Sequence, residues 1–148
     1  MVFLVFSNFF LFWNIKLDII LFSRVLFFFV LLLLSACFSG SETSFFSLSK
    51  SQVEKIKNSG STGLKISSLL EEPRRLITSI LICNEIVNIA ASSLFVGTIV
   101  LYLGAGSEWL IPCILVPILM IFGEITPKSF AARFPEQSAR FLVFPLSF

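Results

Sequence analysis

Four apolar stretches dominate the chain, and their lengths predict how many helices cross a membrane. They cover residues Met1–Trp13, Ile19–Phe38, Leu76–Leu103 and Trp109–Ile125. A helix rises about 1.5 Å per residue, so crossing a hydrocarbon core of about 30 Å takes roughly 20 residues. The last three stretches are long enough, or nearly so, to be membrane spans. The first is too short to cross alone and is a signal-like region, an interfacial helix or the top of a long first span.

The segment between the first and second spans is polar and is predicted to lie outside the membrane core. Ser39-Gly40-Ser41-Glu42 fits a capping box at the start of a helix. Apolar residues then recur at helical spacing until Asn58-Ser59-Gly60 and Gly63, which are expected to end that helix. Leu64–Glu72 has the pattern of a second amphipathic helix, which Pro73 stops. Both helices are predicted to lie in the membrane interface.

The expected fold is therefore an all-α membrane protein with three transmembrane helices and cytoplasmic amphipathic juxtamembrane helices. Residues 1–18 form an N-terminal apolar extension, and residues 19–148 form the transmembrane domain. The spans are placed at about residues 19–38, 76–103 and 109–125. The juxtamembrane helices are placed at about residues 40–72 and 128–148.

Basic residues predict how the chain is oriented in a cell membrane. The polar segment and the C-terminal tail carry nine of them: Lys50, Lys55, Lys57, Lys65, Arg74, Arg75, Lys128, Arg133 and Arg140. The glycine-rich turn 104–108 carries none. Because basic loops stay on the cytoplasmic side, the polar segment and the C-terminus are expected inside and the N-terminus outside.

Composition excludes several classes of function. The 148 residues are 56% hydrophobic and 14% charged, whereas a soluble domain carries about 25% charged residues. There is no histidine, which excludes histidine-based triads and histidine-ligated metals. A net charge of +2 argues against nucleic acid as a partner, and no glycine-rich phosphate loop is present. We expect no enzymatic activity.

Polar side chains in the second and third spans form a candidate cation site. Asn84, Asn88 and Ser92 are four residues apart, so all three project from one helix face. Glu124 adds a carboxylate near the end of the third span. Pro127 has no N–H, so it leaves the carbonyl of Gly123 without its helical partner. Neutral oxygens with one carboxylate suit Mg²⁺, Ca²⁺ or Na⁺.

Structural explanations exist for the same residues. Asparagine and serine side chains often join membrane helices by hydrogen bonds. Glu124 pairs with Lys128 at i+4 if it lies at headgroup level. Ser39 acts either as a helix cap or as a ligand. Glu85 points about 100° away from Asn84, and its role stays open.

A separate hypothesis concerns Cys37. Leu34-Ser35-Ala36-Cys37 fits the cleavage pattern of bacterial lipoproteins, in which small residues precede a lipidated cysteine. The preceding region is too long and too apolar for that role. Cys37, Cys83 and Cys113 otherwise read as small core residues.

Three motifs, in order along the chain, resemble the transmembrane domain of the CNNM/CorC (cyclin-M-like) magnesium transporters. The first is Ser35-Ala36-Cys37-Phe38-Ser39-Gly40-Ser41-Glu42-Thr43 at the end of a span. The second runs from Ile82 to Ser93, and the third is Phe122-Gly123-Glu124-Ile125-Thr126-Pro127-Lys128. The resemblance covers about residue 31 to the C-terminus.

The resemblance implies a homodimer with three spans per subunit and an external N-terminus. It also implies a dehydrated Mg²⁺, the transported ion, held inside the bundle without an organic cofactor. The implied ligands are Ser39, Asn84, Asn88, Ser92, Glu124 and the Gly123 carbonyl. Glu85 and residues 1–18 depart from the family pattern. The family's nucleotide-binding CBS domains are expected after Phe148, so the transmembrane domain is expected to be C-terminally incomplete, and nucleotide is a partner only through those domains.

The leading hypothesis is thus the membrane domain of a divalent-cation transporter. The alternative is a non-transporting membrane fragment that dimerises with, or scaffolds, a full-length homologue. A lipoprotein or a membrane-lytic peptide is a third possibility.

Overall fold

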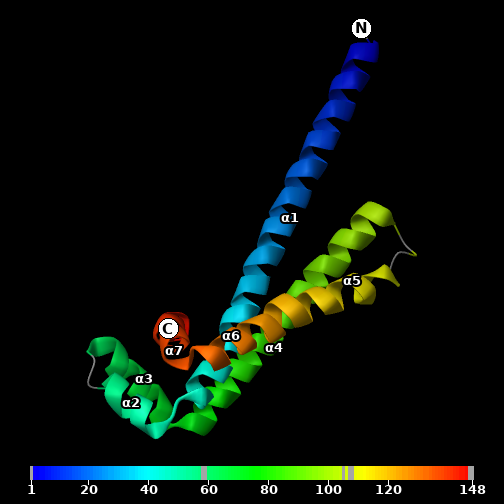
Figure 1. Ribbon diagram of the computed structural model, residues 1–148. Coiled ribbons are helices and arrows are strands. Elements are labelled where there is room, and N and C mark those ends of the chain that lie inside the picture. Colours follow the sequence, from blue (N-terminus) through cyan, green and yellow to red (C-terminus); the bar gives the residue numbers. More distant parts are fainter. Residues whose placement is uncertain (1, 58–59, 105, 107–108, 147–148) are drawn as a thin grey trace.

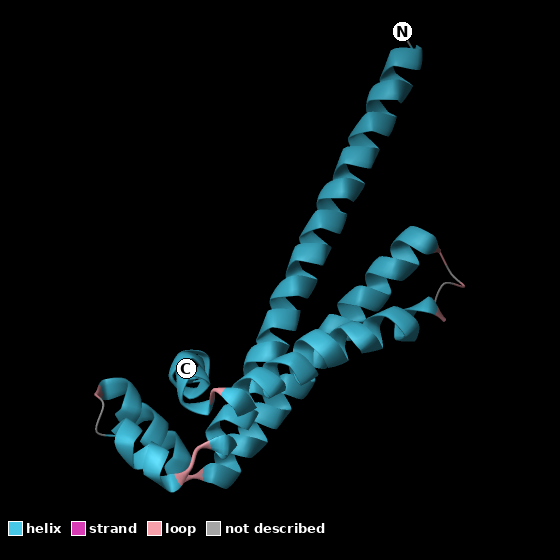
Figure 2. Ribbon diagram, in the orientation of Figure 1, coloured by secondary structure: helices cyan, strands magenta, loops and turns pink. Residues whose placement is uncertain are grey.

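The computed structural model describes residues 2–57, 60–104, 106 and 109–146, with side chains placed from residue 18 to residue 143. The described residues form helices joined by short turns, with no strand among them (Figures 1 and 2). The expected all-α class is confirmed.

Helix α1 (Val2–Ser47) is much longer than a membrane span needs. Its 46 residues extend about 70 Å. The apolar start of the chain is continuous with the first span, which is the third of the alternatives above. The helix also runs on through Ser39–Glu42, so the predicted capping box there is wrong. Hydroxyls in this part bond back to their own helix, as Ser41 Oγ does to the Cys37 carbonyl at 2.6 Å, and the helix needs no break.

Two short helices follow at one end of the molecule. They are α2 (Lys50–Lys57) and α3 (Ser61–Glu71). Asn58 and Ser59, expected to end α2, lie outside the described residues, but Gly60 beside them has a φ of 106°, which favours glycine. Gly63 does not end a helix; it is buried inside α3.

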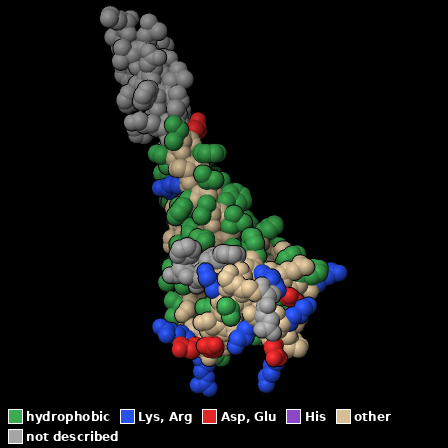
Figure 3. Space-filling view, turned by 90° about the vertical axis from the view of Figure 1, so that its left-hand side faces the viewer, with side chains coloured by type: hydrophobic (Ala, Val, Ile, Leu, Met, Phe, Trp, Pro, Cys, Tyr) green, Lys and Arg blue, Asp and Glu red, His purple; other side chains and the backbone are tan. Residues whose placement is uncertain are grey.

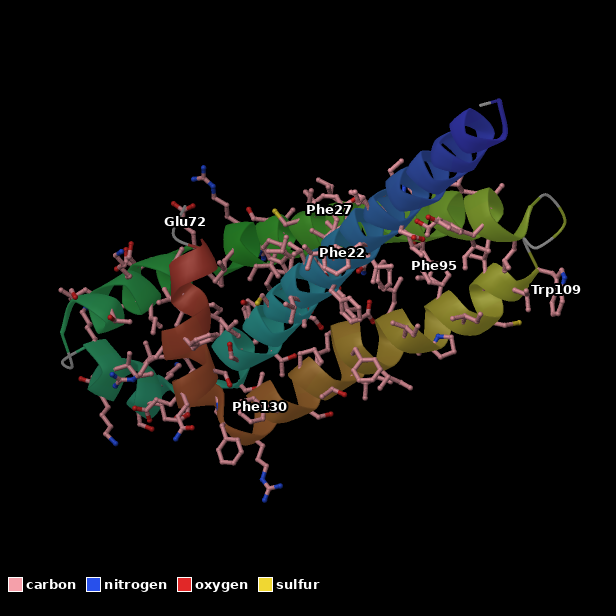
Figure 4. All side chains as sticks on the ribbon, turned by 90° about the horizontal axis from the view of Figure 1, so that it is seen from above. Phe22, Phe27, Glu72, Phe95, Trp109 and Phe130 are labelled. Atoms are coloured by element: carbon pink, nitrogen blue, oxygen red, sulfur yellow. The ribbon has the colours of Figure 1, made fainter. Side chains whose placement is uncertain are left out.

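The second span is α4 (Pro73–Leu103). Pro73 begins this helix as well as ending the previous one, because a residue in the first turn needs no N–H donor. Gly104 caps its far end with a φ of 81°. α4 then turns back into the third span, and Figure 4 shows α1 passing between the two, in contact with both.

The third span combines three helical segments. These are α5 (Leu110–Ile118), the π-helix η1 (Leu119–Ile125) and α6 (Thr126–Arg133). The predicted end of the span at residue 125 falls inside a continuous helical run. Helix α7 (Pro135–Leu146) then packs beside α1 and α3.

Among the residues that the structure describes, three helical segments are long and apolar enough to cross a membrane: Asp18–Ser47, Pro73–Leu103 and Leu110–Arg133. This confirms the predicted number of spans. Large apolar side chains remain exposed along them, Phe22 at 71% and Ile86 at 61%. Exposed apolar surface of this extent is stable only against lipid or another protein. Figure 3 shows charged side chains gathered at the end that carries α2, α3 and α7.

Two clusters of buried apolar residues hold the helices together. One joins α1, α2, α3, α4 and α7 at the charged end, with Phe45, Ile56 and Ile66 at its centre. The other lies between the spans and includes Phe28 and Ala91. There the rings of Phe28 and Phe95 lie 5.4 Å apart. The space between the two clusters contains the polar residues described next.

Candidate functional site

Ser35 of α1 is the centre of a polar cluster between the spans. Its side chain is fully buried. Its hydroxyl oxygen lies 2.7 Å from Oδ1 of Asn88 and 3.1 Å from Oδ1 of Asn84. One hydroxyl carries one proton and can donate to one of these oxygens at a time. Three side-chain oxygens from two helices therefore meet at one point.

Asn84 and Asn88 lie one turn apart on α4 and reach the same side chain of α1. Both are half-buried. The four-residue spacing seen in the sequence thus brings the two carboxamides together on the face of α4 that packs against α1.

The backbone of the third span approaches the same hydroxyl. Gly123 of η1 is buried, and a Cβ added there would lie 3.1 Å from Ser35 Oγ. Any larger residue would therefore press on the hydroxyl. Glycine allows the main chain of η1 to come close to the cluster.

The π-helical form of η1 was not foreseen from the sequence. The N–H of Thr126 donates to the carbonyl of Ile121, five residues back. Pro127 has no N–H and gives no helical hydrogen bond to Phe122 or Gly123, which stand five and four residues before it. Widened turns of this kind are frequent at functional sites. The missing N–H of Pro127 was predicted from the sequence. The structure adds that the turns just before it are π-helical rather than α-helical.

Ser39 lies one turn beyond Ser35 on α1, on the same face. It is 1% exposed, and its hydroxyl has no hydrogen-bond partner among the described residues. Leaving a buried hydroxyl unpaired costs about 1–3 kcal/mol. Such an atom calls for a ligand, which an ion or a water supplies.

The remaining predicted residues are less closely joined to the cluster. Ser92 is half-buried, and its hydroxyl donates to the carbonyl of Asn88 at 2.8 Å, within α4. Glu124 is half-buried on η1. The possible pairing of Glu124 with Lys128 is wrong, because the Lys128 ammonium lies 3.2 Å from Glu42 and so joins α6 to α1. Glu85 is exposed on α4.

The sequence-based ligand set omitted Ser35, although a signal for it was present. Ser35 and Ser39 are four residues apart in an apolar helix, which is the spacing that singled out Asn84 and Asn88. No group of three or more acidic, cysteine or histidine side chains that could hold a metal occurs in the described part of the chain. A cation bound here would therefore rely on neutral oxygens and the single carboxylate of Glu124.

Comparison with known proteins agrees with the motifs. The family model described as the cyclin M transmembrane N-terminal domain matches residues 26–148. This match includes the second and third spans, the first span from residue 26 onward, and every residue of the cluster.

Curated relatives match over the same region. The UPF0053 inner membrane protein YfjD of Escherichia coli is 40% identical over 120 residues, which is 76% of this chain and 27% of the relative. A UPF0053 protein of Haemophilus influenzae is 39% identical over 116 residues, again 76% and 27%. A chloroplastic DUF21 domain-containing protein of Arabidopsis thaliana is 31% identical over 118 residues, or 80% and 18%.

The chain thus spans about a quarter of the length of its bacterial relatives. Three apolar spans and an inner-membrane relative make it a multi-pass membrane protein. With a family match over most of its length, the chain belongs to the cyclin M (CNNM/DUF21) transmembrane domain family.

Proposed function

We propose that the chain is the membrane domain of a magnesium transporter and binds a dehydrated ion at the Ser35 cluster. The ligands would be Asn84, Asn88, Ser35, Ser39 and Glu124, with the Gly123 carbonyl. Ser92 is a further candidate ligand. Its hydroxyl donates its proton to the Asn88 main-chain carbonyl, so the lone pairs of the hydroxyl oxygen can still bind a cation. Mg²⁺ takes about six oxygens near 2.1 Å, a number that this set supplies.

The observation that carries the proposal is the convergence of Ser35, Asn84 and Asn88 beside Gly123. Interhelical hydrogen bonding alone explains one serine bonded to one asparagine. It leaves unexplained the buried hydroxyl of Ser39 one turn away, which has no partner among the described residues. A cation between these oxygens would satisfy all of them at once. Transport would follow from exposing this site alternately to the two sides of the membrane.

A second copy of the chain is the proposed partner, besides the bilayer. Glu85 is exposed within a membrane span. A carboxylate in hydrocarbon costs about 2.5–3.5 kcal/mol on insertion scales. A homodimer that covers this part of α4 would remove it from lipid.

Magnesium-dependent stabilisation of the purified protein tests the site. Saturating a site at 100 times its dissociation constant stabilises the folded state by about 2.7 kcal/mol. Asn88→Ala and Glu124→Ala should abolish the magnesium-induced rise in Tm, because each removes an oxygen ligand. Ser93→Ala is the matched control, since Ser93 is exposed on the same helix and should keep the full shift. Equal shifts in the three variants would refute the site.

Flux in proteoliposomes separates transport from the scaffold alternative. Magnesium uptake above that of empty liposomes, lost in Asn88→Ala, supports a transporter. Magnesium binding with flux equal to that of empty liposomes would instead identify a non-transporting membrane fragment. Light scattering of the same preparation should give the mass of two copies.

A further inference from the structure

A groove lies between α3 and α4 at the charged end of the molecule, and none of the proposed ion ligands lines it. It has a volume of about 540 Å³. Its walls come from α3, from one stripe of α4 and from Phe38 of α1. The α4 stripe follows helical spacing: Arg75, Leu76, Ser79, Ile80 and Cys83, with Glu72 directly before the helix.

The groove changes in polarity along its length. Its mouth carries Glu71, Glu72 and Arg75, and the last two form an exposed ion pair at 3.3 Å. Deeper along α4, the wall becomes apolar with Leu76 and Ile80, both buried. From Glu72 to Cys83 the helix advances about 16 Å. In Figure 4, Glu72 lies near one end of α4, and Trp109 lies near the other end.

We infer that this groove binds one phospholipid with a primary-amine headgroup, of the phosphatidylethanolamine class. A charged mouth that leads into an apolar channel along a membrane helix matches a headgroup followed by an acyl chain. The length of the α4 stripe is about half the thickness of the hydrocarbon core, which suits one leaflet.

The charges at the mouth select the headgroup. Two carboxylates and one guanidinium give a formal charge of −1, which disfavours an anionic lipid. A zwitterionic headgroup would place its phosphate at Arg75, whose planar fork suits phosphate. Its ammonium would lie between Glu71 and Glu72 and has three N–H donors for them. The quaternary ammonium of phosphatidylcholine has no such donor.

Native mass spectrometry of the purified protein with added lipids tests the inference. We expect one tightly bound dioleoyl phosphatidylethanolamine per subunit, preferred over phosphatidylcholine and phosphatidylglycerol. Arg75→Gln should weaken its binding about fivefold, the effect of one basic residue at a membrane surface. Glu72→Gln should lower the preference for the amine over the choline headgroup by a similar factor.

Arg74→Gln is the matched control, because Arg74 is exposed on the same turn and does not line this groove. It should bind lipid like the parent chain. Ser79→Trp should block binding of every lipid by filling the groove, and Ser79 is exposed, so the helix tolerates the change. Unaltered lipid binding in Ser79→Trp, or equal effects of the two arginine substitutions, would overturn the inference. So would efficient disulfide cross-linking through Cys83 between two copies, because the groove would then be covered by protein.

Discussion

At the scale of single residues, the polar groups buried around Ser35 carry an energetic cost that calls for an explanation. A fully buried hydroxyl faces two carboxamide oxygens, and the neighbouring Ser39 hydroxyl is buried without a partner. Unpaired polar atoms are costly, and membrane proteins tend to keep them where they serve function. The cost is offset if an ion supplies the missing partner.

Replacing Ser35 tests whether this residue organises the cluster. Ser35→Ala removes the donor shared by Asn84 and Asn88, and we expect a loss of about 1 kcal/mol in the free energy of unfolding. The magnesium-induced rise in Tm should fall as well. Ser23→Ala is the control, because Ser23 is an exposed serine of α1 whose hydroxyl bonds only to its own helix, at the Ile20 carbonyl. Similar Tm changes in both variants would contradict a special role for Ser35.

At the scale of the element, the third span is shaped by its prolines. Pro117 stands inside α5, and Pro127 lies just beyond η1, so the span lacks two helical donors. Between them the chain adopts π-helical turns, and Gly123 comes close to α1. The irregular part of this span is thus the part nearest the polar cluster, where irregular backbone at membrane depth is tolerated.

Restoring the donor of Pro127 tests the role of the freed carbonyls. Pro127→Ala supplies an N–H while keeping the Cβ that packs near Gly40. We expect magnesium affinity to fall about tenfold, because a carbonyl ligand becomes bonded within the helix, while stability without magnesium stays equal or rises. Pro117→Ala should leave magnesium affinity unchanged, since Pro117 is exposed in α5. Thermal-shift titrations with magnesium measure the affinity of both variants. An equal loss of affinity in Pro117→Ala and Pro127→Ala would argue against a carbonyl ligand freed by Pro127.

At the scale of the whole molecule, charge and apolar surface are separated along the spans. The charged end is formed by α2, α3 and α7, and the connection between α4 and α5 lies at the other end (Figures 1 and 3). The ion pair between Lys128 and Glu42 fastens α6 to α1 at the charged end. This polarity gives the domain a preferred orientation in a bilayer.

Cysteine labelling in cells tests that orientation. In a chain whose three cysteines are replaced by alanine, Trp109→Cys should react with a membrane-impermeant maleimide in intact cells. Ser51→Cys, on exposed α2 surface, should react only after the cells are opened. The expected contrast follows from the nine basic residues of the polar segment and tail, which predict that this end faces the cytoplasm. The reverse pattern would contradict an external N-terminus.

Much of the helical organisation followed from local pattern. The three spans, the two amphipathic helices after the first, and the shared face of Asn84 and Asn88 all depend on spacing within one helix. The end of the first span was misplaced, since hydroxyls of serines near Ser39 bond within the helix and let it continue to Ser47. A polar segment looks the same in sequence whether it caps a helix or lies buried inside one.

The sequence by itself determined that this chain spans a membrane three times and which oxygen-bearing residues lie on which helix face. Apolar length and residue spacing decide those properties, and both are local. Only the tertiary structure decided that Ser35 is the meeting point and that Gly123 reaches it through a π-helical turn. It also paired Lys128 with Glu42 rather than with Glu124. These depend on how three helices approach and rotate against one another, and packing of side chains far apart in the chain sets that geometry.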